Sequence, residues 1–175
     1  TLFFGGMTLG TLIYGPLSDS IGRRPAIFAS LALYGIGTII CFFSWSFPMI
    51  IIGRRVQGFG ASGPRIVSIA MIRDGQAGAA MARIMSFVMS VFMLVPILAP
   101  SVGQLVLFVA SWRIIFVGFF AIGAMAMTWF YVRQEETLPR ERRAPLSATA
   151  MLQAAGQFFR HPVALGYTLA VGCIF

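Results

Sequence analysis

The chain consists largely of apolar stretches that are each long enough to cross a lipid bilayer. The second of them, residues 26–43, would span about 27 Å as an α-helix, which matches the thickness of the hydrocarbon core. Backbone polar groups inside a bilayer must be satisfied within the segment, so such stretches predict helices. The expected fold class is all-α, a polytopic membrane helix bundle. Its predicted spans are residues 1–17, 26–43, 49–71, 84–108 and 114–132, with a sixth that begins near residue 163.

The composition agrees with a membrane protein and argues against other classes. Hydrophobic residues make up 58% of the 175 residues and charged residues 10%, whereas a soluble domain has about 25% charged residues. The net charge of +8 comes from arginines dispersed between apolar runs, so they form no basic face and nucleic acid is not expected as a partner. The sequence contains no nucleophile–base pair, metal-ligand cluster or phosphate loop. We therefore expect neither an enzyme nor a cofactor.

The arginines also indicate how the segments are oriented. The connections at residues 15–25, 73–83 and 133–160 carry most of them, whereas those at 44–48 and 109–112 carry no charge. Arginine-rich loops stay in the cytoplasm, so the first, third and fifth segments are expected to end there. Every basic residue is arginine, which is consistent with a GC-rich bacterial genome. We predict a multi-pass protein of the bacterial inner membrane, surrounded by membrane lipid.

The connection at residues 15–25 reads Gly-Pro-Leu-Ser-Asp-Ser-Ile-Gly-Arg-Arg-Pro. It predicts a tight polar hairpin, with Pro25 at the start of the next helix. Its pattern, G-x-L-x-D-x-x-G-R-R-P, resembles the loop between the second and third helices of major facilitator superfamily transporters. Ser20 departs from that family, which usually has a basic residue there, and a solvated turn is the alternative. The resemblance implies a conformational latch against the other half of the transporter, formed by Gly15, Asp19, Gly22, Arg23 and Arg24.

The third apolar segment contains the pattern R-x-x-Q-G-x-G-A, which begins at Arg54 and resembles a motif of the family's fourth helix. Arg54 would lie about 8 Å from the outer face, where a charge needs a partner or water. The resemblance implies a role for Arg54 in proton coupling. The alternative is that Arg54 reaches the outer interface, as we expect for Arg55. Gln57, Gly58 and Gly60 are expected to serve helix packing.

The fourth apolar segment resembles the antiporter motif G-P-x-x-G-G of the family's fifth helix. Two prolines four residues apart remove helix hydrogen bonds and are expected to bend the helix. Small residues near such a bend let a facing helix pack closely, and the resemblance implies a seal against proton leak. Ala99 and Gln104 stand where the motif has glycine. The motif residues are Pro96, Ala99, Pro100 and Gly103.

These motifs together resemble the bicyclomycin-resistance (Bcr/CflA) group of drug:proton antiporters over nearly the whole chain. The resemblance implies a partial chain that runs from about helix two to the start of helix seven of a twelve-helix fold. The expected organisation is an N-terminal transmembrane bundle (1–132), a cytoplasmic linker with a short surface helix (133–160) and the start of a second bundle (161–175).

The function implied by this resemblance is efflux of small amphipathic drugs in exchange for protons, by alternating access in a full-length monomer. No acidic residue lies within an apolar segment, so the proton-carrying carboxylate is expected on the family's first helix. Two alternatives remain: a carrier of another small solute, such as a sugar, metabolite or siderophore, and a non-transporting membrane scaffold subunit.

Overall fold

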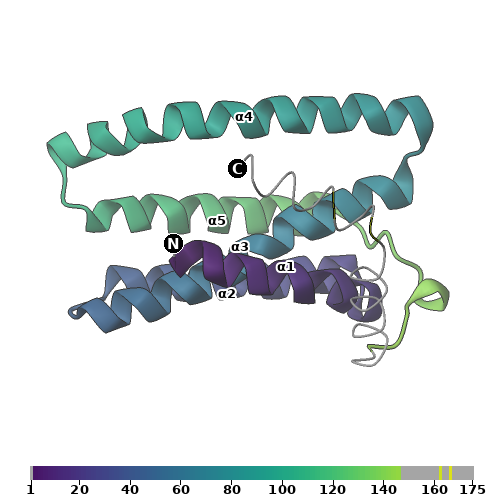
Figure 1. Cartoon of the computed structure of the whole chain (residues 1–175), viewed down its shortest axis with the longest axis horizontal. Coiled ribbons are helices and arrows are strands. Elements are labelled where there is room, and N and C mark those ends of the chain that lie inside the picture. The colour runs from purple at the N-terminus through teal and green to yellow at the C-terminus, as the bar shows by residue number, and fades with distance from the viewer. Residues whose placement is uncertain (1, 147–161, 163–165, 167–175) are drawn as a thin grey trace. The chain divides into compact units, whose positions relative to one another are not determined.

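The chain forms a series of long antiparallel helices in the computed structural model, which describes residues 2–146, 162 and 166. Successive helices run in opposite directions (Figure 1). No strand occurs among these residues, so the predicted all-α class is confirmed. The elements are α1 (Leu2–Ile21), α2 (Arg23–Phe42), α3 (Phe47–Gly75), α4 (Gly78–Val109), α5 (Arg113–Arg133) and the short 3-10 helix η1 (Arg140–Arg142).

The chain divides after Arg143 into two compact units, and all of these elements belong to the first. The first unit therefore includes the ten residues that come after α5, which the sequence assigned to a linker. The predicted surface helix, within 146–159, and the predicted start of a second bundle, 161–175, lie almost wholly outside the described residues.

Three of the helices, α2, α4 and α5, are long and apolar enough to cross a membrane. Helices α1 and α3 are also long, at 20 and 29 residues, but they contain more glycine and polar residues. Several of these residues are buried against neighbouring helices, among them Gly10, Ser18, Gln57 and Ser62. Part of the glycine and polar content of α1 and α3 therefore serves helix contacts inside the bundle.

The predicted hairpin loop at residues 15–25 is wrong in its extent, because nearly all of it is helical. Helix α1 continues through Pro16 to Ile21, and α2 begins at Arg23, two residues before the predicted start, with Gly22 alone between them. The hydroxyl groups of Ser18 and Ser20 each donate to the carbonyl three residues earlier, so these polar residues fit within a helix. The polar residues show where the chain leaves the hydrocarbon core of the membrane. The hydrogen-bonded helix continues past that point.

Helix α3 packs backbone to backbone against α1 and α2 because glycines line both contacts. A methyl group at Gly60 would lie 2.7 Å from the carbonyl oxygen of Ser30 in α2 and would overlap the backbone of Tyr34. On the other side of α3, a methyl group at Gly58 would overlap the carbonyl of Phe3 in α1. Small residues of this kind let membrane helices approach closely, so α1, α2 and α3 form a tightly fitted group.

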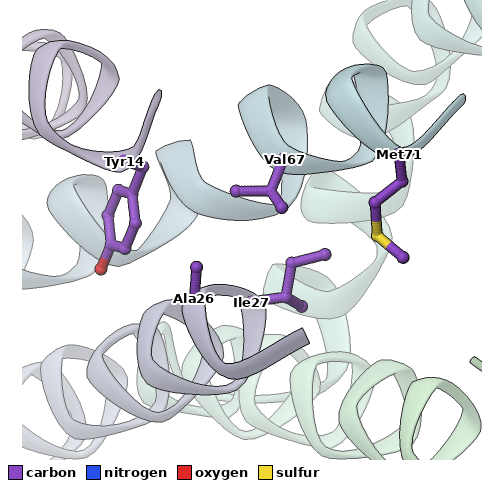
Figure 2. Packing of buried hydrophobic residues seen from close by; sticks show 5 residues of the cluster. All are labelled: Tyr14, Ala26, Ile27, Val67 and Met71. Atoms are coloured by element: carbon purple, nitrogen blue, oxygen red, sulfur yellow. The ribbon is translucent and has the colours of Figure 1, made fainter. Parts of the chain in front are cut away.

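An apolar cluster joins the same three helices near the α1–α2 turn. Tyr14 from α1, Ala26 and Ile27 from α2, and Val67 and Met71 from α3 are all buried there (Figure 2). Helix α5 packs against α2 and buries Phe116. In the part of the chain that the structure describes, α4 buries no residue. The compact part of the first unit is therefore built from α1, α2, α3 and α5.

Candidate functional site

A group of charged side chains surrounds Arg23 at the α1–α2 turn; we call Ser18, Asp19, Arg23 and Asp74 the Arg23 cluster. The guanidinium of Arg23 donates through Nη1 to the Ser18 hydroxyl, 2.7 Å away, and pairs with Asp19 through the same nitrogen. Its Nε donates to Asp74 Oδ2 at 2.9 Å. Arg23 is only 7% exposed, and a charge so buried is stable only when it is paired. The cluster therefore ties the α1–α2 turn to the end of α3.

The two carboxylates of the Arg23 cluster differ in their exposure. The side chain of Asp74 is 24% exposed, whereas that of Asp19 is 50% exposed. Asp19 can thus accept a further partner while it stays paired with Arg23. Asp74 was not among the predicted site residues, since 51 positions separate it from Arg23 and no motif spacing connects them.

Glu136, in the segment after α5, satisfies the first turn of α2. Its Oε1 accepts hydrogen bonds from the backbone N–H groups of Arg23, at 2.9 Å, and Leu138, at 3.1 Å. Its Oε2 accepts the N–H of Arg24 at 3.1 Å, and the next residue is a proline without an N–H. A carboxylate at a helix N-terminus also interacts favourably with the helix dipole. Glu136 therefore acts as the cap that the chain next to α2 does not provide.

Gly22 allows this cap to form. Its φ of 109° lies in a region that side-chain-bearing residues rarely adopt. A methyl group there would lie 2.6 Å from Glu136 Oε2 and 2.8 Å from Arg143 Nη2. The conformation and the available space both require glycine at this position.

The other two predicted latch residues lie apart from the Arg23 cluster. Arg24 donates through Nη2 to the carbonyl of Tyr131, at 2.9 Å, and its guanidinium lies over the rings of Phe28 and Tyr131 at 5.7 and 5.4 Å. It thus connects the start of α2 to the end of α5. Gly15 has no neighbour among the described residues within 4 Å of an added methyl group. The structure therefore brings together Asp19, Gly22 and Arg23, whereas Gly15 contributes only its carbonyl, which accepts the Ser18 hydroxyl.

Arg54 forms a second polar group between α2, α3 and α5. Its Nη1 donates to Gln57 Oε1 at 3.1 Å, and Gln57 Nε2 donates to the Thr38 hydroxyl at 2.9 Å. The Arg54 guanidinium also lies 5.0 Å from the centre of the Phe116 ring. Gln57 is 1% exposed, so this glutamine is a buried hydrogen-bonding link as well as a packing residue. Arg55, the next residue along α3, is exposed.

The motif of the fourth apolar segment lies on α4, which is an unbroken helix through both prolines. Pro96, Ala99 and Pro100 are exposed, and among the described residues nothing lies within 4 Å of a methyl group added at Gly103. The structure thus places these residues away from both polar groups. No set of His, Cys, Asp or Glu side chains suited to a metal ion occurs among the described residues.

The sequence matches the Major Facilitator Superfamily over residues 1–175. It is 32% identical to the "Uncharacterized MFS-type transporter YdgK" of Bacillus subtilis, over 97% of this chain and 42% of that protein. It is 29% identical to the "Bicyclomycin resistance protein homolog" of Haemophilus influenzae, over 100% of this chain and 44% of that protein. It is also 29% identical to the "Multidrug resistance protein MdtL" of Salmonella heidelberg, over 99% of this chain and 45% of that protein.

The chain therefore spans less than half the length of these relatives. Among solved structures, the human organic anion transporter MFSD10 (TETRAN) has a similar fold. The TM-score is 0.71 and the sequence identity 23%, and the match covers 82% of this chain and 33% of the human one.

Proposed function

Because the chain belongs to the major facilitator superfamily, we propose that the full-length protein is a proton-coupled exporter of small amphipathic drugs in the bacterial inner membrane. The observation that carries this proposal is the match to relatives named for bicyclomycin and multidrug resistance, which extends over 99–100% of the chain. The resemblance inferred from the motifs is confirmed at the level of the family and of these relatives. Transport of a small molecule across the membrane, coupling to protons and a monomeric state are all parts of the proposal.

In this proposal the Arg23 cluster is one half of a contact that forms and breaks during alternating access. The glycine-lined packing of α1, α2 and α3 supports their movement as a rigid group. Arg23 is held by Asp19 and Asp74, and Asp19 keeps half of its side chain exposed for a partner in the second bundle. A surface ion pair or helix-end contact of this kind can be present in one state and absent in the other.

Arg54 is the residue that we propose for coupling to the proton. Its partners within the described residues are the neutral Gln57 and the ring of Phe116, and none of the ion pairs found there includes it. A half-buried guanidinium without a carboxylate favours the ionised form of any acid that approaches it. We propose that this acid lies on the family's first helix, and that its protonation weakens its pairing with Arg54.

Everted membrane vesicles that contain the full-length protein test this function. We expect a fluorescent cationic drug to accumulate when respiration generates a proton gradient, and accumulation to stop when an uncoupler is added. Arg54→Ala should lower the initial rate about tenfold, as expected for the loss of a charged hydrogen bond. Arg55→Ala, which removes the exposed neighbour, is the matched control and should retain most of the rate. An absence of gradient-driven accumulation by the wild-type protein would contradict the proposal and favour another solute or a scaffold role.

A further inference from the structure

A pocket of about 680 Å³ lies at the α1–α2 turn, between the first turn of α2 and the segment after α5. The polar lining residues, which we call the polar wall, are Arg24, Arg140, Arg143 and Glu136. The lining also includes the apolar side chains of Phe28 and Leu138, and the Arg24 guanidinium lies over the Phe28 ring. All of these residues belong to the first compact unit. The pocket thus combines a group of guanidinium side chains with an apolar surface.

The polar wall carries an excess of positive charge. The lining includes three arginines and one glutamate, which together give it a net charge of +2. The Glu136 oxygens are also committed to other donors, since they accept the N–H groups of Arg23, Arg24 and Leu138. The remaining contact of Glu136 with Arg143 is a long ion pair of 3.8 Å. Among the described residues, the guanidinium groups of these three arginines form one hydrogen bond, from Arg24 Nη2 to the Tyr131 carbonyl.

Two donors in this wall lack an acceptor. The Nε atoms of Arg24 and Arg143 are buried, and neither has a hydrogen-bond partner within the part of the chain that the structure describes. Buried polar atoms without partners are uncommon in folded proteins. These two Nε atoms have almost no exposed surface, so an anion in the pocket would meet the terminal guanidinium nitrogens and would reach the Nε atoms only after the side chains turn.

We propose that this pocket binds a phosphate group, presented by the headgroup of an anionic phospholipid. Planar guanidinium groups match the geometry of phosphate oxygens and form paired hydrogen bonds with them. Basic pockets at the ends of membrane helices recognise anionic headgroups, and the pocket lies at the arginine-rich end of the bundle, where α2 begins and α5 terminates. The apolar side chains of Phe28 and Leu138 suit the apolar part of such a lipid. This site goes beyond the transport function and does not depend on it.

Thermal unfolding of the full-length protein, purified in detergent and stripped of lipid, measures this binding. Phosphatidylglycerol should raise the midpoint of unfolding in a saturable manner, and phosphatidylcholine should have a much smaller effect. A titration with inorganic phosphate in the absence of lipid distinguishes the two possible ligands, a phospholipid headgroup and free phosphate. If it binds as tightly as the lipid and at the same arginines, the phosphate site stands and its natural ligand is free phosphate. If neither phosphatidylglycerol nor phosphate shifts the midpoint, the proposal is wrong.

Helix η1 offers a matched pair of variants for this experiment. Arg140 and Arg142 are both exposed and carry the same charge, but only Arg140 is among the pocket-lining residues. Arg140→Gln should weaken phosphatidylglycerol binding about fivefold, and Arg142→Gln should leave it within about twofold of wild type. Arg143→Gln should also weaken binding about fivefold, provided that it folds. Equal losses for Arg140→Gln and Arg142→Gln would show general charge attraction and would overturn the proposed site.

Discussion

Replacement of Gly22 by alanine should strongly destabilise the contact between the α1–α2 turn and the segment after α5. Two terms contribute to the loss. Alanine at a φ of 109° and a ψ of 158° is in a region that is almost exclusive to glycine, at a cost of about 1–3 kcal/mol. Its methyl group would also lie 2.6 Å from Glu136 Oε2, so the carboxylate must move away from α2.

The second term comes from the hydrogen bonds of that carboxylate. Two of the backbone N–H groups that Glu136 accepts belong to α2, those of Arg23 and Arg24, and a bond of this kind contributes about 1 kcal/mol net when the group can otherwise reach water. We therefore expect Gly22→Ala to lower the free energy of unfolding by about 3–5 kcal/mol. Gly118→Ala is the control, because Gly118 lies exposed on α5 and no described residue is within 4 Å of the added methyl group. It should be neutral or stabilise by about 1 kcal/mol.

A double-mutant cycle with Glu136→Ala, combined with unfolding of the purified full-length protein in detergent, tests the reasoning. If Gly22→Ala acts partly by displacing Glu136, its cost should fall to the backbone term of about 1–3 kcal/mol once Glu136 is absent. Strict additivity of the two substitutions would refute the proposed link between them. A Gly22→Ala protein as stable as the Gly118→Ala control would refute both terms.

Two further predictions concern the bundle itself. Gly60→Ala places a methyl group 2.7 Å from the Ser30 carbonyl oxygen, so it should separate α2 from α3 and cost about 1–3 kcal/mol of unfolding free energy relative to Gly118→Ala. Asp74→Asn removes one of the two carboxylates that neutralise Arg23, and it should cost about 1.5–3 kcal/mol in the same unfolding measurement. Asp19→Asn should cost less than Asp74→Asn, because the Asp19 side chain is half exposed; the reverse order would contradict the burial argument.

Helices α2, α4 and α5 could be predicted from the sequence because apolar stretches of membrane-spanning length must be helical in a bilayer. Helices α1 and α3 were also expected, although polar residues interrupt their apolar runs. The extent of the first turn could not, since hydropathy detects the end of the apolar run and not the end of the hydrogen-bonded helix. Residues 16–21 are polar enough to suggest a loop, yet they complete the last turns of α1. The family motif singled out Asp19 and Arg23 as parts of a latch against the other half of the transporter. In the structure these two residues pair with each other, and the latch stays a prediction.

The sequence did not predict which residues from distant parts of the chain contact Arg23 and Gln57. Asp74 and Glu136 lie 51 and 113 positions after Arg23, and no periodicity relates them to it. Gln57 was expected to serve packing, since a glutamine beside glycines gives no sign that its amide will meet a threonine on the neighbouring helix. In each case the missing information is the position of one helix against another.

The Glu136 cap also changes how much chain is available to connect the first unit with a second bundle. Ten residues, 134–143, lie between the end of α5 and the boundary of the unit, and they would span about 35 Å if they were extended. Glu136 is bonded to the start of α2, and Arg143 pairs with Glu136, so these ten residues belong to the first unit. A segment that connects this unit to a second bundle therefore begins after Arg143, and its maximum length is reduced by the same amount. Loss of the Glu136 contacts would thus lengthen the connecting segment, although no residue is inserted.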